Sequence, residues 1–149
     1  MACATRVVGY VRTSPLHRDL VEQERKLRNA GCTLLFVERE GYREIWQAIA
    51  AENQFPDRPA LDAMLREIRS GDLVIVWRLD RLGRSLTDLA DILWELSRRK
   101  VGFRSLCERI DTTGKNGDLV LRIVTAIASF DSFDAEDGVV GRTLRRAGE

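Results

Sequence analysis

Two short polar segments, each directly after an apolar run, carry residue types suited to chemistry on phosphate. Residues 10–14 read YVRTS and residues 79–85 read LDRLGRS. Together they supply a hydroxyl, three guanidinium groups and a carboxylate: Ser14, Arg12, Arg81, Arg84 and Asp80. A serine hydroxyl is a nucleophile, and guanidinium groups stabilise the negative charge that builds on phosphate oxygens in a transition state. The two segments therefore predict attack of a serine on a phosphate ester.

The spacing within each segment favours a common site. Arg12 and Ser14 are two residues apart, so both side chains point to one side of an extended strand. Arg81 and Arg84 are three apart and share a face if their segment is a helical turn. Asp80 is placed to orient one of them through a bidentate ion pair. In the alternative interpretation, these side chains do not converge: the charged residues form surface ion pairs and Ser14 caps a turn.

The sequence leaves two routes for activating Ser14. His17 is the only histidine and lies three residues later, so a Ser–His pair is conceivable. No carboxylate can be identified to orient its imidazole, and a solvated loop position explains His17 more simply. The other route is a cluster of guanidinium groups that favours alkoxide character at the serine.

Apolar periodicity predicts the elements that must position these residues. Strands are expected at residues 6–11, 33–37, 73–77 and 102–106, and helices at residues 19–30, 57–70, 86–99 and 119–133. Asp57 is the expected N-cap of the second helix, with Pro59 in its first turn. This alternation predicts an α/β fold with a mainly parallel central sheet flanked by helices, whose sites form at the carboxyl ends of strands. Residues 39–55 give no clear prediction.

Composition limits the class of protein. The chain has 149 residues, 44% hydrophobic and 32% charged, which fits one globular domain. It has no apolar run of membrane-spanning length and no signal-peptide pattern, so we expect a cytoplasmic location and no membrane partner. The cysteines and the single histidine lack metal-ligand spacing, which predicts no metal site. The net charge is only +1, but 21 of the 24 basic residues are arginine, which suits phosphate binding. GC-rich codon usage explains that bias equally well.

With these two segments, the chain resembles the catalytic domain of the serine site-specific recombinases, the resolvase and DNA invertase family. The resemblance implies that Ser14 is the nucleophile, with Arg12, Arg81 and Arg84 as phosphate-binding groups and Asp80 as their acidic partner. Gln23 and Arg58 also match active-site positions of the family and are expected to bind the DNA phosphate. The reaction implied is DNA strand breakage and rejoining through a 5′-phosphoserine intermediate, in site-specific inversion, resolution or integration.

The resemblance also implies partners. Family members act on double-stranded DNA without a cofactor, as homodimers that pair into a tetramer on synapsis. Their long helix near the end of the domain carries dimer contacts. Here its apolar face comprises Leu121, Val124, Ile127, Ala128 and Phe130. An ordinary core helix explains that face equally well.

The chain departs from the family pattern at several positions. Pro15 stands where threonine is usual, Arg18 replaces a common glutamine, and residues 39–55 make a longer loop. We expect residues 1–130 to form the catalytic domain, including the start of the long helix. Residues 131–149 are expected to form an atypical tail, acidic and then basic, with no DNA-reading domain.

Two functional hypotheses follow. The first is a recombinase catalytic domain, and the second is a non-catalytic remnant that dimerises or binds DNA weakly. A nucleotide-binding domain is disfavoured, since no glycine-rich phosphate loop follows the first strand.

Overall fold

The fold is built on a five-stranded sheet. The computed structural model describes residues 5–14, 18–52 and 57–130. Its strands are β1 (Val7–Thr13), β2 (Leu34–Arg39), β3 (Leu73–Val76), β4 (Gly102–Ser105) and β5 (Ile110–Asp111). They lie in the order β2-β1-β3-β4-β5, with β1 parallel to β2 and β3, β3 parallel to β4, and β5 antiparallel to β4. The mainly parallel α/β fold predicted from the sequence is confirmed.

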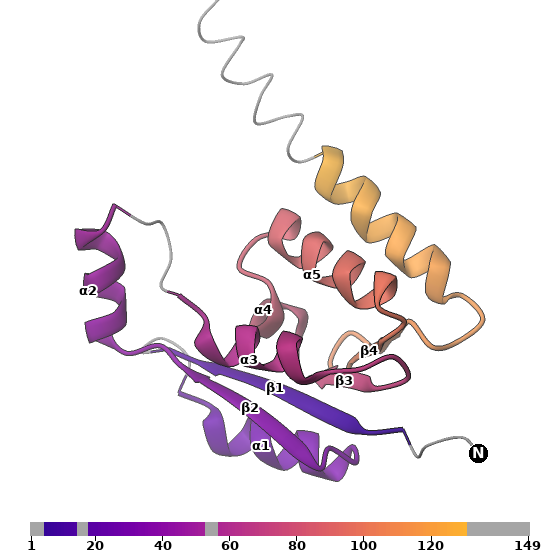
Figure 1. Cartoon of the computed structure of the whole chain (residues 1–149), viewed down its shortest axis with the longest axis horizontal. Helices are drawn as coiled ribbons and strands as arrows, with labels where there is room; N and C mark the ends of the chain where they lie inside the picture. The colour runs from indigo at the N-terminus through magenta and orange to yellow at the C-terminus, as the bar shows by residue number, and fades with distance from the viewer. Residues whose placement is uncertain (1–4, 15–17, 53–56, 131–149) are drawn as a thin grey trace, which may run out of the picture.

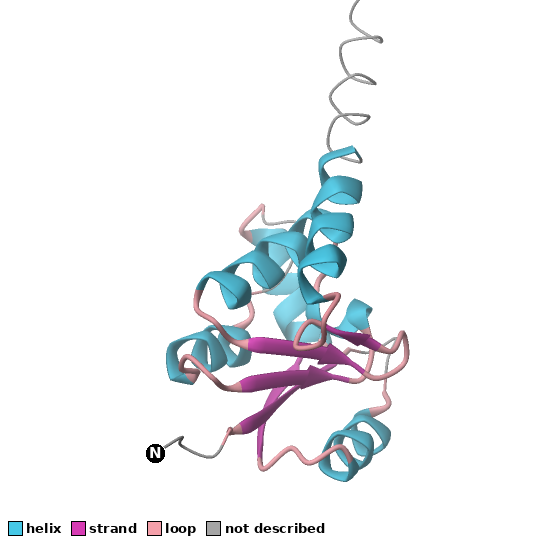
Figure 2. Ribbon diagram, turned by 90° about the vertical axis from the view of Figure 1, so that its right-hand side faces the viewer, coloured by secondary structure: helices cyan, strands magenta, loops and turns pink. Residues whose placement is uncertain are grey.

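Helices cover both faces of this sheet (Figures 1 and 2). They are α1 (Leu20–Asn29), α2 (Tyr42–Ala50), α3 (Pro59–Glu67), the single turn α4 (Leu79–Leu82), α5 (Leu86–Arg98) and a last helix over residues 117–130. Figure 1 shows α1 on one side of the sheet and α3 and α5 on the other. The last helix lies beside α5, as expected for a helix near the end of the domain.

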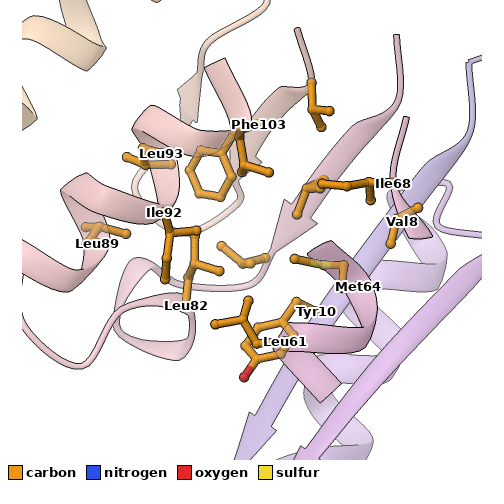
Figure 3. Packing of buried hydrophobic residues seen from close by; sticks show 14 of the residues in the cluster. Val8, Tyr10, Leu61, Met64, Ile68, Leu82, Leu89, Ile92, Leu93 and Phe103 are labelled. Atoms are coloured by element: carbon orange, nitrogen blue, oxygen red, sulfur yellow. The ribbon is translucent and has the colours of Figure 1, made fainter. Parts of the chain in front are cut away.

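The sheet separates the hydrophobic core into two clusters, and the side chains of β1 alternate between them. Val8 and Tyr10 face α3 and α5, where they join a cluster that includes Met64, Leu93 and Phe103 (Figure 3). Val11 faces α1 and packs in a smaller cluster on that side of the sheet. Because side chains of a strand alternate between faces, Arg12 continues the side of Val8 and Tyr10. The core thereby directs Arg12 towards the α3 and α5 side.

The N-terminus of α3 differs from the sequence prediction. Asp57 is not its N-cap; Arg58 holds that position, without a side-chain capping bond. The buried Glu38 of β2 replaces the cap, because its carboxyl oxygens accept the backbone N–H groups of Ala60 (3.2 Å) and Leu61 (3.0 Å). Glu38 also accepts a hydrogen bond of 3.1 Å from the hydroxyl of Tyr10. A cap supplied by another element leaves no local sequence signal.

The last helix begins at residue 117 and, among the described residues, continues to residue 130; its predicted end at residues 131–133 lies outside them. Leu121 and Ala128 are buried, and Val124 packs against the main core. Ile127 and Phe130 are 51% and 67% exposed. The core interpretation is therefore right for three of the five apolar residues and wrong for two. None of the helices in the described ranges is both long enough and apolar enough to cross a membrane.

Candidate active site

The predicted site residues follow strands that meet at one edge of the sheet. The strand order reverses between β1 and β3, since β2 lies on one side of β1 and β3 lies on the other. The carboxyl ends of strands at such a switch point form a natural crevice for a ligand. Ser14 follows β1 directly, and α4 begins three residues after the end of β3. The topology therefore brings the two polar segments together.

A buried carboxylate connects two of the predicted arginines. Glu40 lies just beyond β2 and is 9% exposed. Its Oε1 pairs with Nη2 of Arg84, and its Oε2 lies 3.6 Å from Nη1 of Arg12. Arg12 and Arg84, separated by 72 positions in the chain, are thus held by one side chain.

Arg12 is also tied to α4. Its Nε donates to the carbonyl oxygen of Arg81 at 3.2 Å, and its Nη2 donates to the carbonyl oxygen of Asp80. These bonds fix the guanidinium across the gap between β1 and the turn after β3. Of the three arginines that the sequence predicted as a cluster, Arg12 and Arg84 share Glu40. Arg81 is joined to Arg12 through its carbonyl oxygen.

Arg81 is the most deeply buried of these arginines, at 3% exposure. Its Nη2 donates to Asp19 at 2.7 Å, and its guanidinium carbon lies 5.7 Å from the ring centroid of Trp77. Its Nε is buried and has no hydrogen-bond partner within the described part of the chain. Burial opposes ionisation of Asp19, but hydrogen bonds from Arg81 and Gln23 outweigh it and hold the pKa of that carboxyl below its ordinary value.

Asp80 does not form the bidentate pair that the sequence suggested. One carboxylate oxygen lies 3.3 Å from Nη1 of Arg81 and the other lies 3.2 Å from Nη2 of Arg78. Its charge is therefore divided between two arginines. Arg84 falls after the end of this turn, so Arg81 and Arg84 do not share a helix face.

Gln23 and Arg58 are both held by groups of the protein. The amide of the fully buried Gln23 spans the backbone of Arg12, accepting from its N–H at 3.3 Å and donating to its carbonyl oxygen at 2.9 Å. Arg58 donates to the carbonyl oxygen of Leu82 at 2.9 Å and to Asp88 at 2.7 Å. In this structure these contacts position the end of β1 and the α4 turn, and the predicted phosphate contacts of Gln23 and Arg58 stay predictions.

The turn from α4 to α5 is encoded locally. Ser85 caps α5 by accepting the N–H of Asp88 at 3.0 Å, and the Asp88 carboxylate accepts the N–H of Arg84 at 2.9 Å. Gly83 permits this tight turn, because a Cβ there would lie 2.6 Å from the Cβ of Leu89 and 2.8 Å from its Cα. Burial opposes ionisation of Asp88, yet the bonds from Arg58 and the Arg84 backbone lower its pKa.

Ser14 opens onto a pocket of about 380 Å³ beside this arginine cluster. The pocket is lined by Thr13, Ser14, Arg18, Leu20, Arg39, Glu40, Gly41 and Tyr42. Glu40 belongs to both, so the pocket and the cluster are contiguous. No hydrogen bond joins the Ser14 hydroxyl to an arginine among the described residues. Pro15 and His17 lie outside the described residues, so the Ser–His pair stays untested.

Sequence reasoning missed the carboxylates that organise the site. Glu40, Asp19 and Asp88 hold Arg12, Arg81, Arg84 and Arg58 between them. A signal existed for Glu40, since it lies three residues after the predicted strand 33–37, which corresponds to β2 beside β1. Asp19 and Asp88 stand in the first turns of predicted helices, where a carboxylate is ordinary and does not identify a site.

Comparison with known proteins identifies the protein family. Residues 7–145 match the family described as "Resolvase, N terminal domain". The chain therefore belongs to this family of serine recombinase catalytic domains.

Individual relatives support the same family assignment. The chain is 34% identical over 125 residues to the DNA-invertase of Escherichia phage P1, covering 84% of this chain and 61% of the relative. It is 36% identical over 143 residues to the transposon Tn552 DNA-invertase BinR of Staphylococcus aureus, covering 94% and 69% of the two chains. It spans about three fifths of the length of the phage relative.

Solved structures share the fold. The N-terminal catalytic domain of TP901-1 integrase superposes with a TM-score of 0.66 at 25% identity, over 86% of this chain and 97% of that one. A resolvase family site-specific recombinase from Streptococcus pneumoniae has a TM-score of 0.75 at 17% identity, over 98% of this chain and 100% of that one. The latter supports the fold alone.

Proposed function

We propose that this chain is the catalytic domain of a serine site-specific recombinase, which breaks and rejoins DNA strands with Ser14 as nucleophile. The observation that carries the proposal is the convergence of Arg12 and Arg84 on Glu40, which also lines the Ser14 pocket. Membership of the resolvase family supports the same activity. The non-catalytic remnant is not favoured, because the chain belongs to the resolvase family and retains Ser14 together with Arg12, Arg81 and Arg84.

In the proposed reaction, the oxygen of Ser14 attacks a backbone phosphorus atom of double-stranded DNA. A bond forms between Ser14 Oγ and phosphorus, and the bond from phosphorus to the 3′ oxygen breaks. The serine loses its proton, and the leaving 3′ oxygen gains one to become a hydroxyl. A new 3′-hydroxyl reverses the step and rejoins the strand. The phosphoester energy is retained throughout, so rejoining needs no nucleotide cofactor.

The arginines contribute positioning and charge. Arg12, Arg81 and Arg84 are proposed to bind the non-bridging oxygens of the attacked phosphate and to stabilise the negative charge of the transition state. In the structure each of these guanidinium groups is paired with a carboxylate. A phosphate must therefore compete with Glu40 and Asp19 for the same donors. Catalytic hydrogen bonds often tighten only with substrate bound, which fits this arrangement.

A covalent-trapping experiment tests the proposal. The chain is fused to a DNA-binding module of known specificity, incubated with supercoiled plasmid carrying paired sites, and denatured. We expect protein attached to DNA 5′ ends, lost in Ser14→Ala and retained in the control Ser97→Ala, whose residue is exposed on α5. An adduct that survives in Ser14→Ala, or none from a folded and bound fusion, contradicts the proposal.

Self-association is part of the proposal. The last helix exposes apolar side chains spaced four, four and three residues apart, which places them on one face: Leu119, Ile123, Ile127 and Phe130. We propose that this face makes a homodimer, and that two dimers form a tetramer on DNA. The cytoplasmic location expected from the sequence belongs to the same proposal, since the substrate is DNA.

A further inference from the structure

Helix α2 contributes little to the hydrophobic core. It lies within the stretch that the sequence left without a prediction, and Ala48 is its only buried residue. Tyr42, Trp46 and Ile49 are 64%, 66% and 55% exposed. Their spacing of four and three residues places them on one helix face. Figure 1 shows α2 at the edge of the domain, following β2. An exposed face with two large aromatic side chains is costly unless something binds it.

This face is continuous with the pocket of Ser14. Tyr42 belongs both to the exposed face of α2 and to the wall of the pocket. Gly41 and Glu40, which precede it, line the same pocket, and Glu40 holds the arginine cluster. The first turn of α2 is therefore fixed beside the proposed nucleophile. Tyr42 and Ser14 therefore line the same pocket.

The rim of the Ser14 pocket carries arginines that are not paired with carboxylates of the described residues. Arg18 and Arg39 line it and are exposed, and Arg43 is exposed on the first turn of α2. None of these three forms an ion pair with a carboxylate in the described parts of the chain, whereas Arg12, Arg81 and Arg84 all do. Glu44, the acidic residue of the first turn of α2, accepts the N–H of Gly41 at 2.9 Å. The rim therefore suits a polyanion.

We propose that α2 and the pocket rim bind the DNA duplex that flanks the phosphate attacked by Ser14. Arg18, Arg39 and Arg43 contact neighbouring phosphates, while Tyr42 and Trp46 pack against sugars and base edges. Aromatic and apolar side chains beside arginines are a common means of binding a nucleic acid groove. This inference rests on the proposed function, since it takes Ser14 as the point of attack.

The dimensions of α2 fit that role. Nine residues at about 1.5 Å each make a helix of roughly 13 Å. Nucleotides of one strand are about 3.4 Å apart along B-DNA, so α2 covers roughly four of them. The proposed contact therefore lies within a few nucleotides of the cleaved bond.

Equilibrium binding of the whole chain to a labelled mixed-sequence duplex at low salt tests the inference. We expect Tyr42→Ala combined with Trp46→Ala to weaken binding about tenfold or more, since the variant loses the packing of two aromatic side chains against sugars and base edges. Trp94→Ala, which removes an exposed tryptophan of α5, is the matched control and is expected to bind as the unmodified chain. Circular dichroism of each variant confirms that it is folded.

The arginines give a second readout that does not depend on the aromatic residues. Log affinity falls with log salt, and Arg39→Gln and Arg43→Gln are each expected to reduce the magnitude of that slope by about 0.9. Arg66→Gln is the matched control, exposed on α3. A slope unchanged in both rim variants overturns the phosphate contacts.

The outcomes separate this inference from the proposed function. Ser14→Ala is expected to bind the duplex normally while forming no covalent adduct. Wild-type affinity in the α2 variants, or no binding by the unmodified chain, overturns the inference and leaves the trapping result to judge Ser14. An α2 variant that loses self-association in sedimentation, with unchanged DNA affinity, assigns the face to a second copy of the chain instead. If α2 contributes to binding but no adduct forms at Ser14, the proposed function fails and the DNA surface stands.

Discussion

Glu40 and Arg84 form an ion pair in which each side chain is only 8% exposed. The second oxygen of Glu40 lies 3.6 Å from Arg12, so one carboxylate faces two guanidinium groups. Opposite charges in a region with little water interact strongly, and removing one of them leaves the others buried without compensation. Glu40 therefore both organises the arginines and occupies the donors that a phosphate would need.

Glu40→Gln is expected to destabilise the fold and to strengthen anion binding. Loss of a buried charge beside Arg12 and Arg84 is expected to cost about 3 kcal/mol in free energy of unfolding. The same change frees guanidinium donors, so sulfate should raise the melting temperature of the variant more than that of the unmodified chain. Thermal unfolding with sulfate, against chloride of equal ionic strength, measures the difference. Equal stabilisation of both proteins would show that Glu40 does not compete with anions.

Low pH is expected to reduce the stability of the fold through protonation of Asp19 and Asp88. Both carboxyls have a folded-state pKa below the ordinary value of 3.8, so their contribution to stability is present above that pH. It is lost as the pH falls through 3.8 towards their folded values. Urea unfolding between about pH 6 and pH 3 should show a fall in stability that is shallower in Asp19→Asn and Asp88→Asn. Asp91→Asn, exposed on α5, is the control and should keep the full fall.

Glu38 is expected to matter more for stability than any sequence pattern suggests. Its buried side chain accepts hydrogen bonds from Tyr10 and from the first turn of α3. Glu38→Ala leaves three donors without an acceptor, which we expect to cost about 4 kcal/mol. Tyr10→Phe removes one donor only and should cost about 1 kcal/mol. Chemical denaturation measures both, with Glu24→Ala on α1 as a control. A loss below 1 kcal/mol for Glu38→Ala would mean that water replaces the cap.

The contrast between Arg12 and Glu40 shows what the sequence could predict. Arg12, Ser14, Arg81 and Arg84 could be identified as candidates, because strands are visible in the sequence as apolar runs with polar residues at their ends. The parallel sheet predicted that both segments lie at carboxyl ends of strands, and the structure adds that Arg12 and Arg84 share Glu40. The partners of those arginines did not follow, because an ion pair such as Glu40–Arg84 joins residues 44 positions apart and has no periodic signal.

Helix α2 was missed for a different physical reason. Tyr42, Trp46 and Ile49 do have helical spacing, but the helix is only nine residues long and exposes these side chains instead of directing them at the core. The cap of α3 was misplaced because Glu38, from a neighbouring strand, takes the role that Asp57 would play in an isolated helix. In both cases tertiary context decided the outcome.

The exposed face of the last helix supplies the last prediction. Leu119, Ile123, Ile127 and Phe130 form an apolar stripe that no described part of the chain covers, while Leu121 and Ala128 face the core. Ile123→Asp places a charge within that stripe and leaves the core-facing residues untouched. A charge in the centre of an apolar interface is expected to raise the dimer dissociation constant about thirtyfold. Sedimentation equilibrium measures this constant, and Ile49→Asp on α2 is a control with the same substitution at another exposed isoleucine. If Ile123→Asp associates as the unmodified chain does while Ile49→Asp becomes monomeric, the dimer forms through α2, and the proposed role of the last helix is wrong.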